Sequence, residues 1–166
     1  MSEHVGQMSK SQRLERLLEV NRTISATLDL IQLLDMIIDV ACELTQSEAA
    51  SILLYDSGAG VLRFEASPGM HREDLREISV PLDSSVAGWI FTNSKPMVIQ
   101  DTRDDPRVYR QVDEILKFET QSILGVPLSV KTETIGVLEA VNKLDNADYT
   151  EDDLEVLETL AGQAAI

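Results

Sequence analysis

Near the C-terminal end of this 166-residue chain, the amide Asn142 and the ammonium Lys143 come directly after a β-branched apolar run. A polar loop, the aromatic Tyr149 and a helix that begins at Thr150 follow them. An ammonium group at a strand end can bind an anion, and one charge-assisted hydrogen bond contributes roughly 1.5 to 3 kcal/mol. Asp153 has the spacing of a capping box with Thr150, and the lysine can equally pair with an acidic neighbour. The pattern therefore predicts either a lysine that binds an anion or a lysine held in an ion pair.

The other chemically capable residues do not combine into a catalytic centre. Ser84–Ser85 and Asp101 have no histidine arranged with them as a triad. The only cysteine, Cys42, falls inside a predicted helix, where a small core or boundary residue is expected. The sequence has no glycine-rich phosphate loop. We expect no enzymatic activity, no metal and no cofactor.

The composition limits the classes of partner that this protein is expected to bind. The net charge of −15 and the isoelectric point near 4.4 exclude nucleic acid and anionic membranes as expected partners. Apolar runs are too short to span a bilayer, and residues 1–12 have no apolar segment of a secretory signal. We expect a disordered tail over 1–12, one domain over 13–166, and a cytoplasmic location.

Two helices are predicted to lead the domain. The first carries apolar residues and one asparagine at the alternating three- and four-residue spacing of a coiled-coil seam: Leu14, Leu17, Asn21, Ile24 and Leu28. This helix either forms a homodimer or packs on its own domain, and we favour the homodimer. The second helix restarts at Asp29 and has a broad apolar face.

Period-two alternation predicts hairpin-connected strands, with Pro127 at an edge or a bulge. Hairpins imply an antiparallel sheet with helices on its faces, which is an α+β layer fold. The expected strands lie at 51–55, 61–66, 78–82, 98–99, 122–130 and 135–141, and the connecting helices at 86–91 and 106–118.

The final helix begins at the capping residue Thr150 and has its own apolar stripe from Leu154 to Ala164. We expect this stripe to add to the dimer surface. The helix reaches Ile166 without a stop signal, so the natural chain is expected to continue into an output domain.

Three stretches, in this order, resemble GAF domains, the small-molecule-sensing modules of signalling proteins, and the resemblance covers residues 13–166. They read LLEVNRTISATLDLIQLLDMIIDVACELTQSEAASILLYD, ISVPLDSSVAGWIFTNSKPMVIQDTRDDPR and SILGVPLSVKTETIGVLEAVNKLDNADYTEDDLEVLETLAGQAA. The resemblance implies a central antiparallel sheet of about six strands, with terminal helices on one face and short helices and loops over a ligand pocket on the other.

By this resemblance, a ligand would contact residues from several elements, with two arginines around the Asp-Pro loop offsetting an anionic charge. They are Ser51, Leu53, Ala87, Gly88, Trp89, Ile90, Asp101, Arg103, Arg107, Tyr109, Ser122, Ala140, Asn142 and Lys143.

GAF domains that bind cyclic nucleotides carry Asn-Lys, a spacer, Phe, three residues and then Asp-Glu. Asn142, Lys143 and Asp153 match this signature, whereas Tyr149 replaces Phe and Leu154 stands where Glu is expected. A cyclic nucleotide is a possible ligand on this ground, but a purely structural role for the motif is favoured.

Other chemistries known in the family fit less well. Tetrapyrrole attachment uses a loop cysteine, and methionine sulfoxide reduction uses several cysteines, whereas this chain has only the helical Cys42. A haem ligand would have to be His71 or the tail residue His4, and an exposed loop histidine is the better interpretation of His71.

Glu139 alternates with Val137 and Val141 on one strand face, so a buried carboxylate there needs a partner, unless it lies near a wet sheet edge. The sequence predicts a GAF-type regulatory sensor that binds a small molecule and relays the signal through dimerising terminal helices. The alternative is an unliganded dimerisation and transmission scaffold.

Overall fold

The computed structural model describes residues 8–26, 30–67, 74–75 and 77–164. Its core is one sheet of six antiparallel strands in the order β3-β2-β1-β6-β5-β4. This confirms the α+β prediction. The strands are β1 (Ser47–Asp56), β2 (Val61–Ala66), β3 (Ser79–Val80), β4 (Met97–Ile99), β5 (Ile123–Val130) and β6 (Glu133–Lys143).

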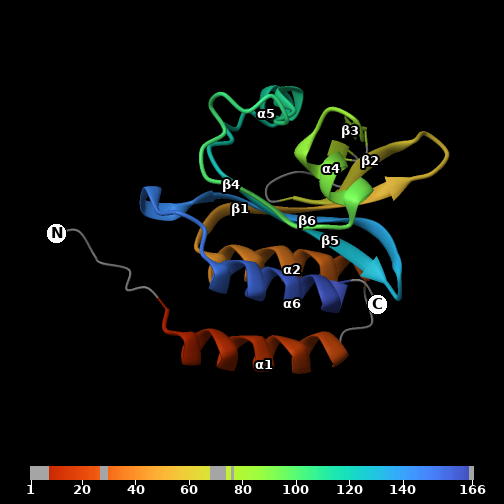
Figure 1. Ribbon diagram of the computed structural model, residues 1–166. Coiled ribbons are helices and arrows are strands. Elements are labelled where there is room, and N and C mark those ends of the chain that lie inside the picture. Colours follow the sequence, from red (N-terminus) through yellow and green to blue (C-terminus); the bar gives the residue numbers. More distant parts are fainter. Residues whose placement is uncertain (1–7, 27–29, 68–73, 76, 165–166) are drawn as a thin grey trace.

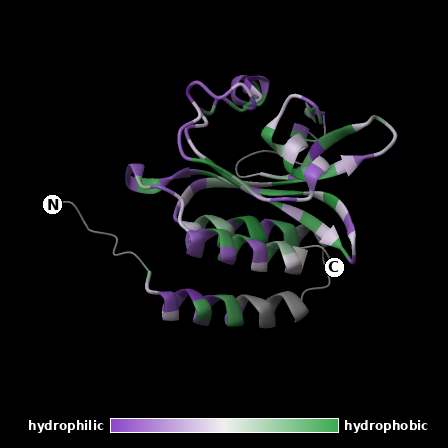
Figure 2. Cartoon of the chain, in the orientation of Figure 1, coloured by the Kyte–Doolittle hydropathy of each residue, from purple (hydrophilic) through white to green (hydrophobic). Residues whose placement is uncertain are grey.

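Helices cover both faces of the sheet, and two separate hydrophobic cores result (Figure 1). The helices α2 (Leu30–Thr45) and α6 (Glu151–Ala164) pack on one face, which we call the helical face. The shorter α4 (Val86–Asn93) and α5 (Arg110–Leu116) lie over the opposite face, the cavity face. Hydrophobic stretches follow the central strands and α2 between these layers (Figure 2). Because strand side chains alternate, neighbouring residues of β6 point into different cores.

Local sequence signals explain where the elements begin. Ser85 caps α4, since its hydroxyl accepts a hydrogen bond from the Gly88 amide at 2.9 Å. Thr150 and Asp153 form the predicted capping box of α6: Thr150 N donates to Asp153 Oδ2 at 2.9 Å, and Asp153 N to Thr150 Oγ1 at 3.2 Å. The pairing of β5 with β4 ends at Gly125, so Pro127 lies in a part of β5 that pairs with β6 alone. Its other side is a sheet edge, as predicted.

The helix α1 (Lys10–Ala26) forms an outer layer beyond α2 and α6 and begins three residues before the predicted domain boundary (Figure 1). Leu17 packs against the core of the helical face. Leu14 and Leu18 are 51% and 62% exposed. The side chains of Asn21 and Ile24, and all of Leu28, lie outside the described residues.

The apolar stripe of α6 is mostly used inside the domain. Leu157, Leu160 and Ala161 are buried in the core of the helical face, because α6 packs on β5 and α2. The expectation that this stripe offers free dimer surface is therefore wrong for these residues. The side chain of Ala164 lies outside the described residues. Across the described ranges, no helix is long and apolar enough to cross a membrane.

Candidate functional site

Lys143, one of the residues expected to contact a ligand, lines an open polar groove, but its ammonium group is directed to the helical face. Its Nζ donates to the Thr45 carbonyl at 2.7 Å and to Asp153 Oδ2 at 2.9 Å, and its side chain is 3% exposed. The Tyr149 ring lies beneath it, with 5.8 Å between Nζ and the ring centroid. The ammonium therefore already has an anionic partner, so we no longer expect it to bind an external anion.

Asp153 joins three elements into one polar cluster, which we call the Asp153 cluster. Besides Lys143 and the Thr150 amide, its carboxylate accepts a hydrogen bond from the Arg13 guanidinium of α1. Arg13 also donates to the Leu44 carbonyl at 2.8 and 3.1 Å. Burial alone would raise the pKa of Asp153, but the donors from Lys143, Thr150 and Arg13 outweigh it and hold that pKa below its ordinary value.

Asn142 has a similar structural role at the end of β6. Its backbone is left-handed, with φ of 61°. Its Oδ1 accepts from the amides of Gln121 at 2.6 Å and Ser122 at 3.2 Å. Its Nδ2 donates to Glu48 Oε2 at 3.0 Å and to the Glu119 carbonyl at 2.7 Å. The Asn-Lys motif therefore closes the strand end, and this geometry explains it without a ligand.

A cavity of about 320 Å³ lies on the cavity face, beside a smaller one of about 60 Å³. The larger volume is within the range of small-molecule sites. Residues of β1, β2, β6 and α5 and the loop after α5 supply the walls. Both cavities share the lining residues Phe64, Val112, Asp113, Thr120, Glu139 and Val141.

Glu139 lies on the floor of this cavity, and its charge is not compensated. In the sheet register it lies between Ser51 of β1 and Gly125 of β5, and Gly125 has no side chain to cover it. Within the described part of the chain it makes no hydrogen bond or ion pair. Burial raises its pKa to about 7, and the nearby Asp113 adds to the rise.

Asp113, by contrast, is satisfied. It accepts from the Thr120 amide at 2.9 Å and the Thr120 hydroxyl at 2.6 Å, and Arg110 lies 3.6 Å from it. The two carboxyl groups thus have different surroundings in one cavity. Glu139 is the one that has room and need for a partner.

The predicted site residues fall into three groups. Ser51, Leu53, Ala87 and Tyr109 line the cavities. Ile90 and Gly88 belong to the packing of α4 behind the cavity: a side chain at Gly88 would collide with the Leu82 backbone at 2.3 Å. Ala140 lies on the helical face, so its predicted position is wrong, because it alternates with Glu139 along β6.

The remaining predicted residues lie at the surface outside the cavities. Arg103 pairs with Asp101 at 2.6 Å, and this pair lines an open polar groove that Ser122 also lines. Arg107 pairs with Asp105 at 2.6 Å, in an outer groove that includes Trp89. Arg103 holds the pKa of Asp101 at about 2. Both arginines expected to offset an anionic ligand are therefore already paired with aspartates.

Sequence reasoning noticed Glu139 but did not include it among the site residues, and it missed Phe64, Asp113, Thr120 and Phe118. The alternation of β6 was the available signal for Glu139. No signal pointed to Asp113 and Thr120, since their contact depends on how the chain folds back after α5.

The single cysteine and the metal-ligating residue types form no reactive thiol or metal centre in the described regions. Burial raises the pKa of the Cys42 thiol to about 11, and the nearby Asp39 carboxylate adds to the rise, so the thiol stays protonated and suits packing. Among the described residues, no group of three or more His, Cys, Asp or Glu side chains is placed to hold a metal.

A family model described as "GAF domain" matches residues 27–166. The chain belongs to the GAF domain family. Among curated proteins, this GAF domain is similar to the Bos taurus rod cGMP-specific 3',5'-cyclic phosphodiesterase subunit alpha, with 25% identity over 126 residues and 70% of the chain. It also matches the Takifugu rubripes dual 3',5'-cyclic-AMP and -GMP phosphodiesterase 11A, with 28% identity over 155 residues and 87% of the chain. The chain spans only 15% and 17% of these relatives' lengths.

Solved structures show the same fold. The GAF domain of a phosphoenolpyruvate-protein phosphotransferase from Coxiella burnetii superposes with a TM-score of 0.84 at 20% identity, covering 95% of this chain and 93% of that one. The free methionine-R-sulfoxide reductase of Neisseria meningitidis, solved with its substrate, superposes at 0.77 with 20% identity, covering 99% and 93%. At these identities the comparison establishes the fold alone.

Proposed function

We propose that this GAF domain is the sensor module of a signalling protein and binds a small molecule in the cavity over β1 and β6. The observation that carries the proposal is Glu139, a carboxylate that no described residue pairs with and that lines a cavity of about 320 Å³. A charge in such a place is costly unless something pairs with it. A domain whose only task was packing would be more stable with an apolar residue there.

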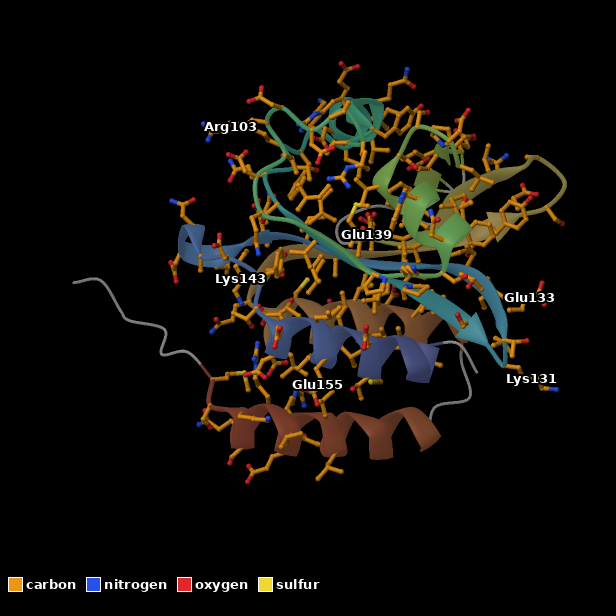
Figure 3. All side chains as sticks on the ribbon, in the orientation of Figure 1. Arg103, Lys131, Glu133, Glu139, Lys143 and Glu155 are labelled. Atoms are coloured by element: carbon orange, nitrogen blue, oxygen red, sulfur yellow. The ribbon has the colours of Figure 1, made fainter. Side chains whose placement is uncertain are left out.

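The Asp153 cluster supports a relay to the terminal helices. Strand β6 carries Glu139 toward the cavity and Lys143 toward the cluster, on opposite sides of the sheet (Figure 3). Through Asp153 and Arg13, Lys143 connects β6 to α6 and α1. A ligand that shifts β6 would therefore act on both terminal helices. We propose that these helices pass the change to an output domain of a cytoplasmic protein, in which the GAF domain itself is regulatory and not enzymatic.

The second candidate function is an unliganded dimerisation scaffold. The exposed Leu14 and Leu18 of α1 favour it, since adjacent apolar side chains on an outer helix suit a second copy of the chain. The two candidates are compatible in one molecule, but only the sensor requires an occupied cavity.

Native mass spectrometry of the purified domain tests the sensor directly. We expect a co-purifying small molecule that is released on denaturation. Ser51→Phe, which places a ring in the cavity, should abolish this adduct, whereas Ser129→Phe at an exposed strand position should retain it. An adduct that survives Ser51→Phe, or its absence from wild-type protein purified under gentle conditions, would favour the scaffold.

A further inference from the structure

We infer that the ligand of this cavity is a small organic cation, an ammonium or amidine group on an apolar body, and that its charged group pairs with Glu139. This inference rests on the proposed function and specifies the class of ligand. It also runs against the anionic ligand that the Asn-Lys motif suggested.

Among the described residues, the charged groups that line the cavities with Glu139 are carboxylates. The titratable groups of the described lining are Glu48 from β1, Asp113 from α5 and Tyr109 just before α5. No lysine, arginine or histidine of the described chain lines either cavity. The guanidinium of Arg110 lies 3.6 Å from Asp113, but it donates to the carbonyls of Thr102 and Thr120 and lines the polar groove outside.

Hydrogen-bond donors within the protein satisfy two of the three carboxylates that line the cavities. Glu48 accepts from Asn142 Nδ2 at 3.0 Å, and Asp113 accepts from Thr120. Glu139 has neither kind of donor. An anion would enter this field without a compensating group, whereas a cation would provide the donor that Glu139 lacks.

The walls beyond Glu139 suit an apolar body. Phe64, Val112, Leu116, Phe118 and Val141 line the larger cavity with aromatic and aliphatic surface. Burying such surface against an apolar ligand removes both from water and favours binding. A molecule with one cationic end and one compact hydrophobic end therefore matches both parts of the site.

Binding of a cation is linked to the ionisation of Glu139. Its pKa of about 7 means that the carboxyl is mostly neutral below pH 7, and a cation must then displace the proton. Affinity should fall by about tenfold for each pH unit well below 7 and should level off above it. Glu48 and Asp113 already accept hydrogen bonds, so we assign this dependence to Glu139.

The experiment compares three probes of nearly the same size: benzylamine as the cation, benzyl alcohol as the neutral analogue and benzoate as the anion. Calorimetry and NMR titration on the whole chain measure their affinities between pH 5.5 and 8.5. We expect benzylamine to bind at least tenfold more tightly than benzyl alcohol at pH 8, and benzoate not to bind. Glu139→Gln should weaken benzylamine by about ten- to a hundredfold.

Glu133→Gln is the matched control, because it makes the same charge change at an exposed position of the same strand (Figure 3). It should leave benzylamine affinity unchanged. Equal binding of benzylamine and benzoate, or an equal effect of the two glutamate substitutions, overturns the cationic class, as does the absence of benzylamine binding at every pH. If benzyl alcohol or benzoate binds as tightly as benzylamine and Ser51→Phe removes that binding, the cavity site stands and only the ligand class fails.

Discussion

Two carboxylates, Asp153 on the helical face and Glu139 on the cavity face, show how one sheet separates structural from functional charge. Asp153 is fully buried and receives hydrogen bonds from Lys143, Thr150 and Arg13. Glu139 is half-buried and receives none from the described residues. Their pKa values accordingly move in opposite directions. A satisfied buried charge holds the fold together, whereas an unsatisfied one weakens the fold and is available to a partner.

Removing the charge of Asp153 should have the largest effect on the stability of the domain. Asp153→Ala leaves Lys143 buried without an anion and removes one of the two hydrogen bonds of the capping box of α6, so we expect the free energy of unfolding to fall by about 3 to 5 kcal/mol. Urea denaturation at pH 7 measures it. Asp152→Ala, an exposed acid in the same helix turn, is the control and should change stability little. A loss of less than about 1 kcal/mol for Asp153→Ala would mean that the cluster is not structural.

Removing the charge of Glu139 should raise the stability of the domain, whereas removing that of Asp153 should lower it. The pKa of Glu139 rises from about 4.5 to about 7 on folding, so the folded state binds more protons between these values and loses stability as pH rises through them. Glu139→Gln should therefore raise the free energy of unfolding at pH 8 by up to about 3 kcal/mol and have little effect at pH 4. Denaturation curves at both pH values, with Glu133→Gln as control, measure this difference. A destabilised Glu139→Gln variant at pH 8 would show that a partner satisfies the carboxylate.

The link from the Asp153 cluster to the outer helix should have an intermediate effect. Arg13→Ala removes the donors to Leu44 and Asp153, and we expect a loss of about 1 to 3 kcal/mol. Hydrogen exchange should show that α1 loses protection before α2 does. Arg16→Ala, which removes only exposed pairs with Glu19 and Glu43, should leave the exchange of α1 nearly unchanged. Equal protection of α1 in both variants would show that the Asp153 cluster does not hold α1 in place and so does not relay a signal to it.

The smallest effect on the domain itself is expected at the outer face of α1. Replacing Leu14 and Leu18 with Glu should leave the stability of each protomer nearly unchanged, because both side chains are mostly exposed. If the predicted homodimer uses this face, the double variant should be monomeric in light scattering at concentrations where the wild type is dimeric. A wild type that is monomeric throughout the micromolar range would refute the homodimer.

The sequence by itself determined the elements and their caps. Alternation in β1, β2, β5 and β6 predicted the antiparallel sheet, and Thr150 with Asp153 predicted the start of α6, because these signals depend on neighbours along the chain. It also identified Glu139 as a residue on an apolar strand face, since period two fixes which residues share a face.

Only the tertiary structure decided which charges are paired. Lys143 has Asp153 and the Thr45 carbonyl within reach because α2, β6 and α6 meet at one corner of the fold. Glu139 has no partner among the described residues, because Gly125 and Ser51 flank it and Asp113 bonds to Thr120. Hydrogen bonds act over about 3 Å, and these contacts form only when separate strands, helices and loops are brought together by the fold. The sequence pattern around Lys143 could therefore not distinguish a structural lysine from one that binds an anion. The pattern around Glu139 likewise could not distinguish a solvated sheet edge from a ligand cavity.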